Sequence, residues 1–351
     1  MGSRSATALS ASSIRLQFST PENIRMSAFG VTFLRAMKER FGPEADPRFH
    51  EGGYLIMAGP EGAATLAANV ETQRREGADT RLIEAGELQK HFGWINPEGL
   101  GAAAHGPNRE GWFDPQALLN TLKREARAAG AEYLTGEVVG IEAGKGRIEA
   151  VRLADGARIA CGALVNAAGP NAGRVAALAG VPLPVEPRKR TVFVLHCRAA
   201  PQGLPLIGDP SGVWMRPEGA FHIAGWSPPP DQDGAADPND FEPDHDQFES
   251  QVWPALAHRV PAFEATKMVR AWVGHYDYNT LDQNGIIGRH PGLENLYFIN
   301  GFSGHGIQQS PAAGRAIVEL IAHGRFQTLD LSRLGYARIA ANEPLREDEV
   351  L

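Results

Sequence analysis

The chain has 351 residues, of which 43% are hydrophobic and 21% are charged, and its formal net charge is -7. This length exceeds one comfortable hydrophobic core, so we expect two intertwined domains that share a cleft. The acidic balance excludes the basic field that nucleic acid or an anionic lipid surface requires, and no uncharged apolar window of about 18 residues predicts a membrane span.

The first predicted elements are helices with clear start signals. Thr20-Pro21-Glu22 combines an N-cap, a proline in the first turn and an early acid, which predicts a helix from Pro21 to Phe41. Asp114-Pro115 predicts a second such start, with an end at Ala129-Gly130. Between them we expect a strand over Gly52–Ala58 and a helix over Glu61–Glu76.

After residue 130 the pattern changes to short strands. We expect them at Tyr133-Leu134, Val138–Ile141 and Ile148–Leu153, with Gly144-Lys145-Gly146 as a hairpin turn, and then at Ala163–Asn166. From residue 181 to about 272, frequent proline and glycine predict short strands in a separate β-rich domain, with a polar acidic loop over Pro228–Pro243.

The chain then returns to α/β character, with a strand over Asn295–Ile299 and a helix over about Ser310–His323. This order, α/β, then β-rich, then α/β, predicts a mixed α/β fold with an inserted β-rich domain.

Two turns carry most of the functional information. Residues 163–173 form an apolar strand that runs into small residues, which let a ligand approach the backbone, although any buried strand before a tight turn has this pattern. Residues 297–311 form a strand followed by three glycines, at 301, 304 and 306, and then a helix start near Gln308. Free N–H groups at such a helix start stabilise an electron-rich group; the alternative is a tight turn with one solvated histidine.

These motifs identify a resemblance. The Asn-Ala-Ala-Gly-Pro turn at 166–170, the stretch from Thr280-Leu-Asp282 to Ile287-Gly288 and the Asn-Gly-Phe-Ser-Gly-His-Gly turn at 300–306 occur in the chain. Together they resemble the D-amino-acid oxidase and sarcosine oxidase family of FAD-dependent oxidoreductases over nearly the whole chain. Residues 10–24 resemble the branch of that family whose mitochondrial member assists complex I assembly.

The resemblance implies an FAD-binding Rossmann-like domain and a β-rich substrate domain. The first would comprise residues 1–50, 101–185 and 275–330, the second residues 51–100 and 186–274, and residues 331–351 would form a C-terminal tail. It also implies that FAD contacts two loops, one strand and the glycine turn, at Ser10, Ala11, Ser12, Ser13, Val139, Ala168, Gly169, Pro170, Gly301, Gly304, His305, Gly306, Ile307 and Gln308. For Val139, a strand residue, packing in the protein core is the alternative explanation.

The chain departs from the family pattern in two respects. Family members begin with a strand, a GxGxxG turn, a helix and a second strand that ends in an acid, and this sequence contains none of them. We therefore expect an N-terminally incomplete FAD domain. Sarcosine oxidases have a lysine where Gln308 stands and attach FAD to a cysteine, whereas Cys161 and Cys197 lie in no matching segment. Non-covalent FAD is expected, with oxygen or an electron carrier as acceptor.

Oxidation of an amine beside a carboxylate requires a cation that binds the carboxylate, and the guanidinium fork of arginine suits this task. Arg15 is the first candidate, and Arg216 and Arg190 follow, with a surface charge as the alternative for both. Tyr276 and His305 complete the candidate catalytic set. Tyr276 and Tyr278 stand where the family places an aromatic wall, although two strand tyrosines also suit a core.

Three functions remain open from the sequence. The first is an FAD-dependent oxidoreductase that acts on an amino acid or secondary amine, the second a non-catalytic assembly or scaffold protein, and the third an inactive truncated product. Two cysteines without CxxC or Cys/His spacing favour a reducing compartment, hence the cytoplasm, and no metal site is predicted. The serine-rich, basic first twenty residues also resemble an organelle-targeting peptide.

Overall fold

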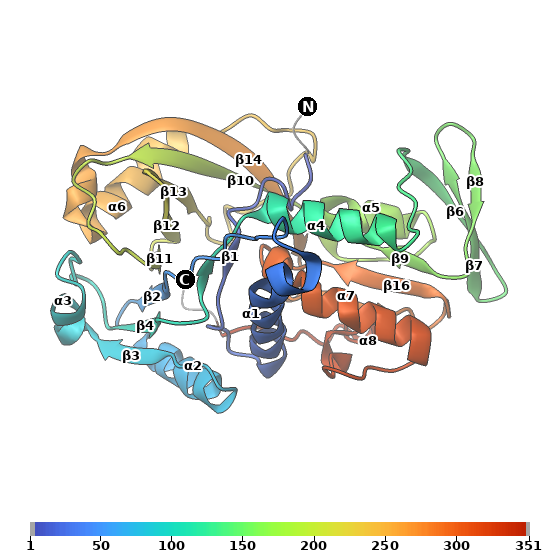
Figure 1. Cartoon of the computed structure of the whole chain (residues 1–351), viewed down its shortest axis with the longest axis horizontal. Coiled ribbons are helices and arrows are strands. Elements are labelled where there is room, and N and C mark those ends of the chain that lie inside the picture. The colour runs from blue at the N-terminus through green and yellow to red at the C-terminus, as the bar shows by residue number, and fades with distance from the viewer. Residues whose placement is uncertain (1–3, 349–351) are drawn as a thin grey trace.

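The structure is a computed structural model that describes residues 4–348. Its largest element is an eight-stranded sheet, seen in the left half of Figure 1, in which only the β11–β2 pair is parallel. The strands, in spatial order, are β14 (Lys267–Asn279), β10 (Val185–His196), β13 (Phe221–Trp226), β12 (Val213–Glu218), β11 (Leu206–Gly208), β2 (Tyr54–Ala58), β4 (Ala102–Gly106) and β3 (Arg81–Glu84).

The other half contains two smaller sheets. In the first, β16 (Leu296–Asn300) pairs with β15 (Ile286–Arg289) and, in parallel, with β9 (Leu164–Asn166). The second is an antiparallel sheet of β6 (Val138–Gly144), β7 (Arg147–Leu153) and β8 (Arg158–Ala160), at the right edge of Figure 1. The short strands β1 (Ser13–Ile14) and β5 (Gly111–Trp112) form a separate pair.

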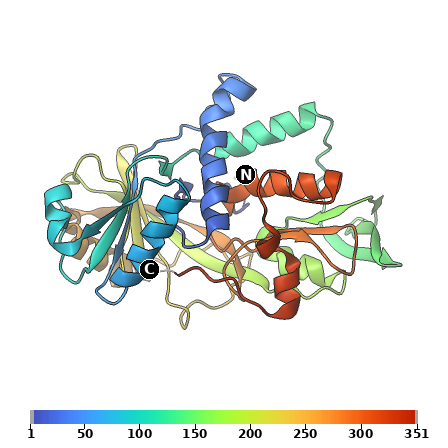
Figure 2. The same cartoon turned by 90° about the horizontal axis from the view of Figure 1, so that it is seen from below.

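Helices connect the two halves. In Figures 1 and 2, α1 (Pro21–Phe41) lies between the eight-stranded sheet and the β15–β16–β9 sheet, and it packs against α7 (Gly306–His323). The remaining α-helices are α2 (Ala63–Arg75), α3 (Leu88–His91), α4 (Pro115–Ala128), α5 (Ala172–Ala177), α6 (Trp253–Arg259) and α8 (Tyr336–Ala341).

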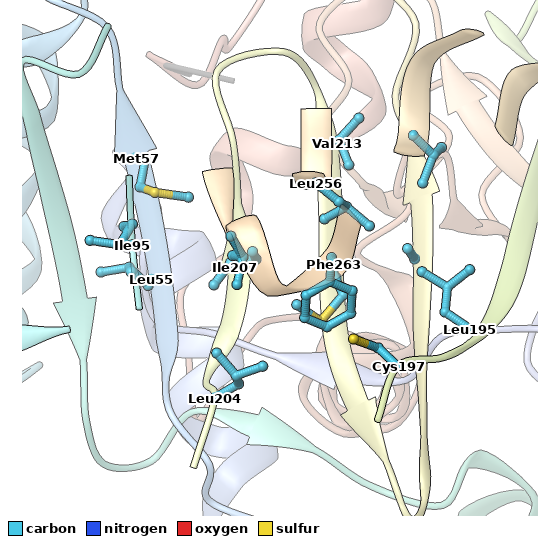
Figure 3. Packing of buried hydrophobic residues seen from close by; sticks show 14 of the residues in the cluster. Leu55, Met57, Ile95, Leu195, Cys197, Leu204, Ile207, Val213, Leu256 and Phe263 are labelled. Atoms are coloured by element: carbon cyan, nitrogen blue, oxygen red, sulfur yellow. The ribbon is translucent and has the colours of Figure 1, made fainter. Parts of the chain in front are cut away.

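The largest hydrophobic cluster lies between the eight-stranded sheet and α6. Figure 3 shows Leu55 and Met57 of β2 beside Ile207 of β11, with Leu256 and Phe263 covering the same face. Each fully buried side chain of this size contributes roughly 1.5–3 kcal/mol to folding. This core fixes the sheet whose β10 and β14 strands extend toward the middle of the molecule.

The predicted α/β fold and the two best-signalled helices are confirmed. Helix α1 has the predicted bounds, and the Asp114 side chain caps α4 by accepting hydrogen bonds from the N–H groups of Gln116 (2.8 Å) and Ala117 (3.0 Å). Strand β2 and helix α2 fall inside their predicted ranges.

Three predictions are wrong. Helix α7 begins at Gly306 rather than Ser310. Pro311 has no N–H to donate to the Ile307 carbonyl, four residues earlier. The helix tolerates it because the Ser310 hydroxyl donates to that carbonyl instead (3.0 Å). Residues 133 and 134 form no strand, since both side chains are exposed. The strands of the β-rich domain are not all short, because β10 and β14 have 12 and 13 residues.

Candidate active site

A cavity of about 930 Å³ lies where the two halves meet. The parts of the chain that line it include the loop around Ser10–Ser13 with Arg15, the turn before α7, the facing parts of β10 and β14, and the polar loop after β13. This volume is within the range of small-molecule and cofactor sites. Because its walls come from segments far apart in the sequence, only the complete fold assembles the site.

Arg15 is the central cation of the cavity wall. Its backbone N–H donates to Gln308 Oε1 (2.9 Å), and its guanidinium donates to the Gln17 carbonyl and to His305 Nε2, the latter at 3.1 Å. The guanidinium also lies over the Phe18 ring, 4.3 Å from its centroid. Among residues 4–348, no aspartate or glutamate forms an ion pair with Arg15. The wall therefore presents a positive charge that no acid of the described chain neutralises.

His305 is uncharged at neutral pH. Burial lowers its pKa to about 3, and the positive charge of Arg15 acts in the same direction. Since arginine only donates, Nε2 of His305 must accept, which leaves the proton on Nδ1. The pair thus combines one permanent cation with a neutral ring.

The turn before α7 has an unusual backbone that Asp277 holds in place. Gly301, Ser303 and Gly304 all have positive φ, at +74°, +51° and +101°. The Asp277 carboxylate accepts hydrogen bonds from the N–H groups of Gly301 (2.8 Å) and Phe302 (3.2 Å). Burial raises the pKa of Asp277 to about 6, and these N–H groups act against the rise. The carboxylate is therefore ionised at pH 7, the form that binds N–H groups most strongly.

The turn delivers the N-terminus of α7 to the cavity. Residues 304–308 line it, and the side chain of the N-cap residue, His305, forms no capping hydrogen bond. The first N–H groups of an α-helix have no partner within the helix and carry its positive dipole end. An electron-rich ligand edge would be stabilised here.

Two tyrosines of the large sheet, Tyr276 and Tyr54, also line the cavity. The ring of Tyr276 in β14 lies against Gly304, and Arg15 acts on the electrostatics of both Tyr276 and Tyr54 of β2. Burial raises the pKa of both phenols, so both are protonated donors at neutral pH.

Arg216 is buried and the Arg190 side chain is only 10% exposed, so the alternative that both are surface charges is wrong. Arg190 binds the Asp233 carboxylate with both terminal nitrogens, at 2.7 and 2.6 Å, and lies 4.9 Å from the centroid of the Tyr276 ring. Arg216 donates to the Ala11 carbonyl from Nε (3.0 Å) and Nη2 (2.6 Å). Arg216 therefore fixes the Ser10–Ser13 loop.

A buried acid holds the segment that follows Arg15. Glu110 accepts from the Leu16 N–H (2.6 Å) and from Gln17 Nε2 (2.7 Å), and burial raises its pKa to about 8. Gln17 itself lines the cavity.

Most of the expected site residues line this one cavity. They are Arg15, Tyr276, Ser10, Ala11, Ser12, Ser13, Gly169, Gly304, His305, Gly306, Ile307 and Gln308. Ala168 and Pro170 flank Gly169 without lining the cavity, and Gly301 packs near Val185 and Asn279. Val139 lies on β6 in the small sheet with 46% of its surface exposed, away from the lining.

Many lining residues were not predicted from the sequence, and among them are Gln17, Tyr54, Asp233 and Asp277. Tyr54 lies in a predicted strand and Asp277 stands between the two tyrosines that were considered. Their convergence depends on the pairing of β10 with β14 and on the placement of β2, which local patterns do not encode.

The remaining candidate groups lie elsewhere or have other partners. Cys197 is buried in the large core and donates its thiol to the Ala262 carbonyl (3.1 Å), and Cys161 does not line the cavity. No group of three or more histidine, cysteine or acidic side chains in residues 4–348 is arranged to bind a metal. In the same range, no helix has the length and apolar character to cross a membrane.

Comparison with known proteins agrees with this geometry. Residues 2–320 match the family described as "DAO: FAD dependent oxidoreductase". The chain is 43% identical to the FAD-dependent oxidoreductase domain-containing protein 1 of Bos taurus, over 99% of this chain and 79% of that protein. It is 25% identical to the mitochondrial sarcosine dehydrogenase of Mus musculus, over 78% of this chain and 31% of that protein.

Among solved structures, the chain is similar to L-proline dehydrogenase from P. horikoshii. The TM-score is 0.85 and the identity 26%, over 97% of this chain and 89% of that one. The expected resemblance and the expected fold are both confirmed by these matches.

Proposed function

The chain belongs to the DAO family of FAD-dependent oxidoreductases, and we propose that it oxidises an amino acid or secondary amine of the sarcosine, glycine or D-amino-acid type. The observation that carries the proposal is the unneutralised guanidinium of Arg15 beside the neutral ring of His305. A cation without an acidic partner in a cavity wall suits a substrate carboxylate. The names of the similar sarcosine and L-proline dehydrogenases support a secondary amine.

The residues of the cavity fit FAD. A ring edge with electron-rich oxygen and nitrogen would meet the N–H groups at the start of α7, from Gly304 to Gln308. The loop at Ser10, Ala11, Ser12 and Ser13 and the turn at Gly169 would contact the same cofactor. Gln308 and the positions of Cys161 and Cys197 support non-covalent binding. When bound, FAD would accept a hydride at N5 from the carbon that bears the substrate nitrogen.

The side chains of the site would orient the substrate. Arg15 would bind its carboxylate with the N–H groups that Gln17 and His305 leave free. Tyr276 would form the wall opposite the turn, and Tyr54 would donate a hydrogen bond from its protonated phenol. Neutral His305 adds no second charge, and the positive charge of Arg15 would favour the neutral form of the substrate nitrogen over the ammonium form. Holding the reacting groups in this geometry supplies much of the rate.

We assign residues 51–100 and 186–274 to a substrate domain, and residues 1–50, 101–185 and 275–330 to the FAD-binding domain. Oxygen or an electron carrier would reoxidise the flavin, since the position of an oxygen-activating lysine holds Gln308. A cytoplasmic enzyme without a nucleic-acid partner is consistent with the acidic composition.

The proposal is tested by product analysis with a panel of amino acids. The FAD-loaded protein is incubated with sarcosine, glycine, proline and D-amino acids and an artificial electron acceptor, and the imine-derived carbonyl product is measured. Turnover of at least one amine that is lost in Arg15→Ala supports the function. A flavin-loaded protein that oxidises none of them favours the non-catalytic scaffold.

A further inference from the structure

We propose that Arg190, which lines the cavity, forms a second carboxylate-binding subsite there, with the nearby Arg188 adding positive charge from outside the lining. It would take the distal carboxylate of a dicarboxylic substrate, such as an amino acid whose nitrogen carries a second carboxymethyl group. That the substrate is an amine rests on the proposed function. The subsite itself rests on the contacts of β10, β14 and the polar loop after β13.

Both arginine side chains are buried with unused hydrogen-bond donors. Arg188 is 8% exposed and Arg190 is 10% exposed. Within residues 4–348, Nε and Nη1 of Arg188 and Nε of Arg190 have no hydrogen-bond partner. A buried donor without an acceptor is costly, and the cost is higher for charged groups. Ligand oxygens at this place would satisfy donors that the described chain leaves unused.

The strand register places these guanidinium groups on the face of two tyrosines. Arg188 is paired with Tyr276 across β10 and β14 and lies 4.7 Å from the centroid of the Tyr278 ring. Arg190 lies 4.9 Å from the centroid of the Tyr276 ring, and the same ring packs against Gly304, next to His305 and its partner Arg15. The two arginines of the cavity lining, Arg15 and Arg190, therefore both lie in the neighbourhood of Tyr276.

Asp233 shows the geometry that a ligand carboxylate would adopt. Its two oxygens accept from the two terminal nitrogens of Arg190, at 2.7 and 2.6 Å, which is the bidentate arrangement that guanidinium groups favour. Asp233 belongs to the polar loop, and it lines the cavity together with Gln232 and Pro228–Pro230. We assign it as an internal competitor that occupies Arg190 until a substrate carboxylate replaces it.

The charges around Arg190 suit a ligand carboxylate that replaces Asp233 better than one that binds beside it. Arg188 pairs with Glu186 (2.6 Å) and lies 3.8 Å from Asp233, so two cations face two acids. A ligand carboxylate that displaces Asp233 keeps this balance. Asp233 is then free to move with its loop into water, where its charge is solvated.

The subsite is tested by ligand binding without turnover. Glutarate has two carboxylates, and valerate has one carboxylate and the same number of carbons. We expect calorimetry on the purified chain to give glutarate a dissociation constant about tenfold lower than that of valerate, the value of one charge-assisted contact. In Arg190→Met this preference disappears. In Arg270→Met, which removes an exposed arginine of the same β-structure, it remains.

A second variant changes affinity in the opposite direction. Asp233→Asn removes the competing charge, so glutarate binds several-fold more tightly, whereas Asp231→Asn at an exposed position of the same loop changes nothing. Equal binding of glutarate and valerate by the unmodified chain overturns the subsite, as does weaker glutarate binding in Asp233→Asn. If the glutarate preference holds and no amine is oxidised, the subsite stands and the proposed function fails. If amines are oxidised with no glutarate preference, only the subsite fails.

Discussion

The ring of Tyr276 packs against the backbone of Gly304 so closely that a Cβ at position 304 would lie 2.6 Å from the ring. Gly304 also has a φ of +101°, which side chains rarely permit. The contact joins β14 of the large sheet to the turn that precedes α7. The contact therefore connects two walls of the cavity.

Gly304→Ala should disturb the turn and weaken FAD binding. The clash with Tyr276 and the left-handed backbone together cost about 1 to 2 kcal/mol or more, so we expect the dissociation constant of FAD, measured by flavin fluorescence, to rise at least tenfold. Gly314→Ala in α7, the helix that follows this turn, is the control, because a Cβ there meets nothing within 4 Å. Unchanged FAD affinity in Gly304→Ala would show that the turn does not hold the cofactor.

Asp277 should make stability depend on pH between about 4 and 6. Its pKa in the fold is raised from 3.8 to about 6, so the folded chain holds a proton that the unfolded chain has already lost. The free energy of unfolding therefore falls as pH rises through this window, by up to about 3 kcal/mol, and is flat above it. Denaturant titrations at pH 4.5 and 7 measure the change. Asp277→Asn should lose this part of the slope, and an identical slope would assign it to other groups.

Arg15→Ala should weaken substrate binding more than it changes folding. A charge-assisted contact contributes about 1.5–3 kcal/mol, so we expect KM to rise roughly 10- to 100-fold. Arg15→Lys should recover part of the loss, because a lysine keeps the charge without the planar fork. Arg40→Ala on the exposed face of α1 is the matched control. An unchanged KM in Arg15→Ala would remove Arg15 from the substrate site.

The C-terminal segment should be held in place by Glu347. Its carboxylate accepts hydrogen bonds from the N–H (2.5 Å) and the hydroxyl (2.6 Å) of Ser19, just before α1. It also accepts from the N–H and the hydroxyl of Thr20 and from Asn23 Nδ2 (2.5 Å). Glu347→Gln weakens these bonds, so proteolysis after residue 342 should become faster. Glu343→Gln, at an exposed position, should leave the rate unchanged. Equal rates in all three proteins would contradict this role.

Local sequence signals predicted the parts of the fold that depend on neighbouring residues. The proline and cap signals gave the start of α1 and of α4, since Thr20 and Asp114 precede prolines at the first helical position. The start of α7, predicted near Gln308 or Ser310, lies at Gly306, and the Ser310 hydroxyl replaces the bond that Pro311 lacks inside the helix.

The site was predictable only as far as its motifs extend. The turn at 300–306 and the segment with Arg15 could be predicted because each is a continuous stretch of sequence. The family resemblance then indicated that both belong to one site. The Arg190–Asp233 pair joins residues of a long strand and a loop, and Tyr54 reaches the cavity through β2. Such contacts depend on strand register and loop path, which no short pattern in this chain specifies.

The most direct test of amine oxidation by this site is the anaerobic reduction of the bound flavin. The FAD-loaded protein is mixed with sarcosine, proline or an N-carboxymethyl amino acid without oxygen, and the visible flavin band is followed in a stopped-flow instrument. We predict that at least one of these amines bleaches the band in a concentration-dependent manner, and that Arg15→Ala needs much more of it. A band that stays oxidised with every amine, in a protein that retains FAD, would contradict amine oxidation by this site.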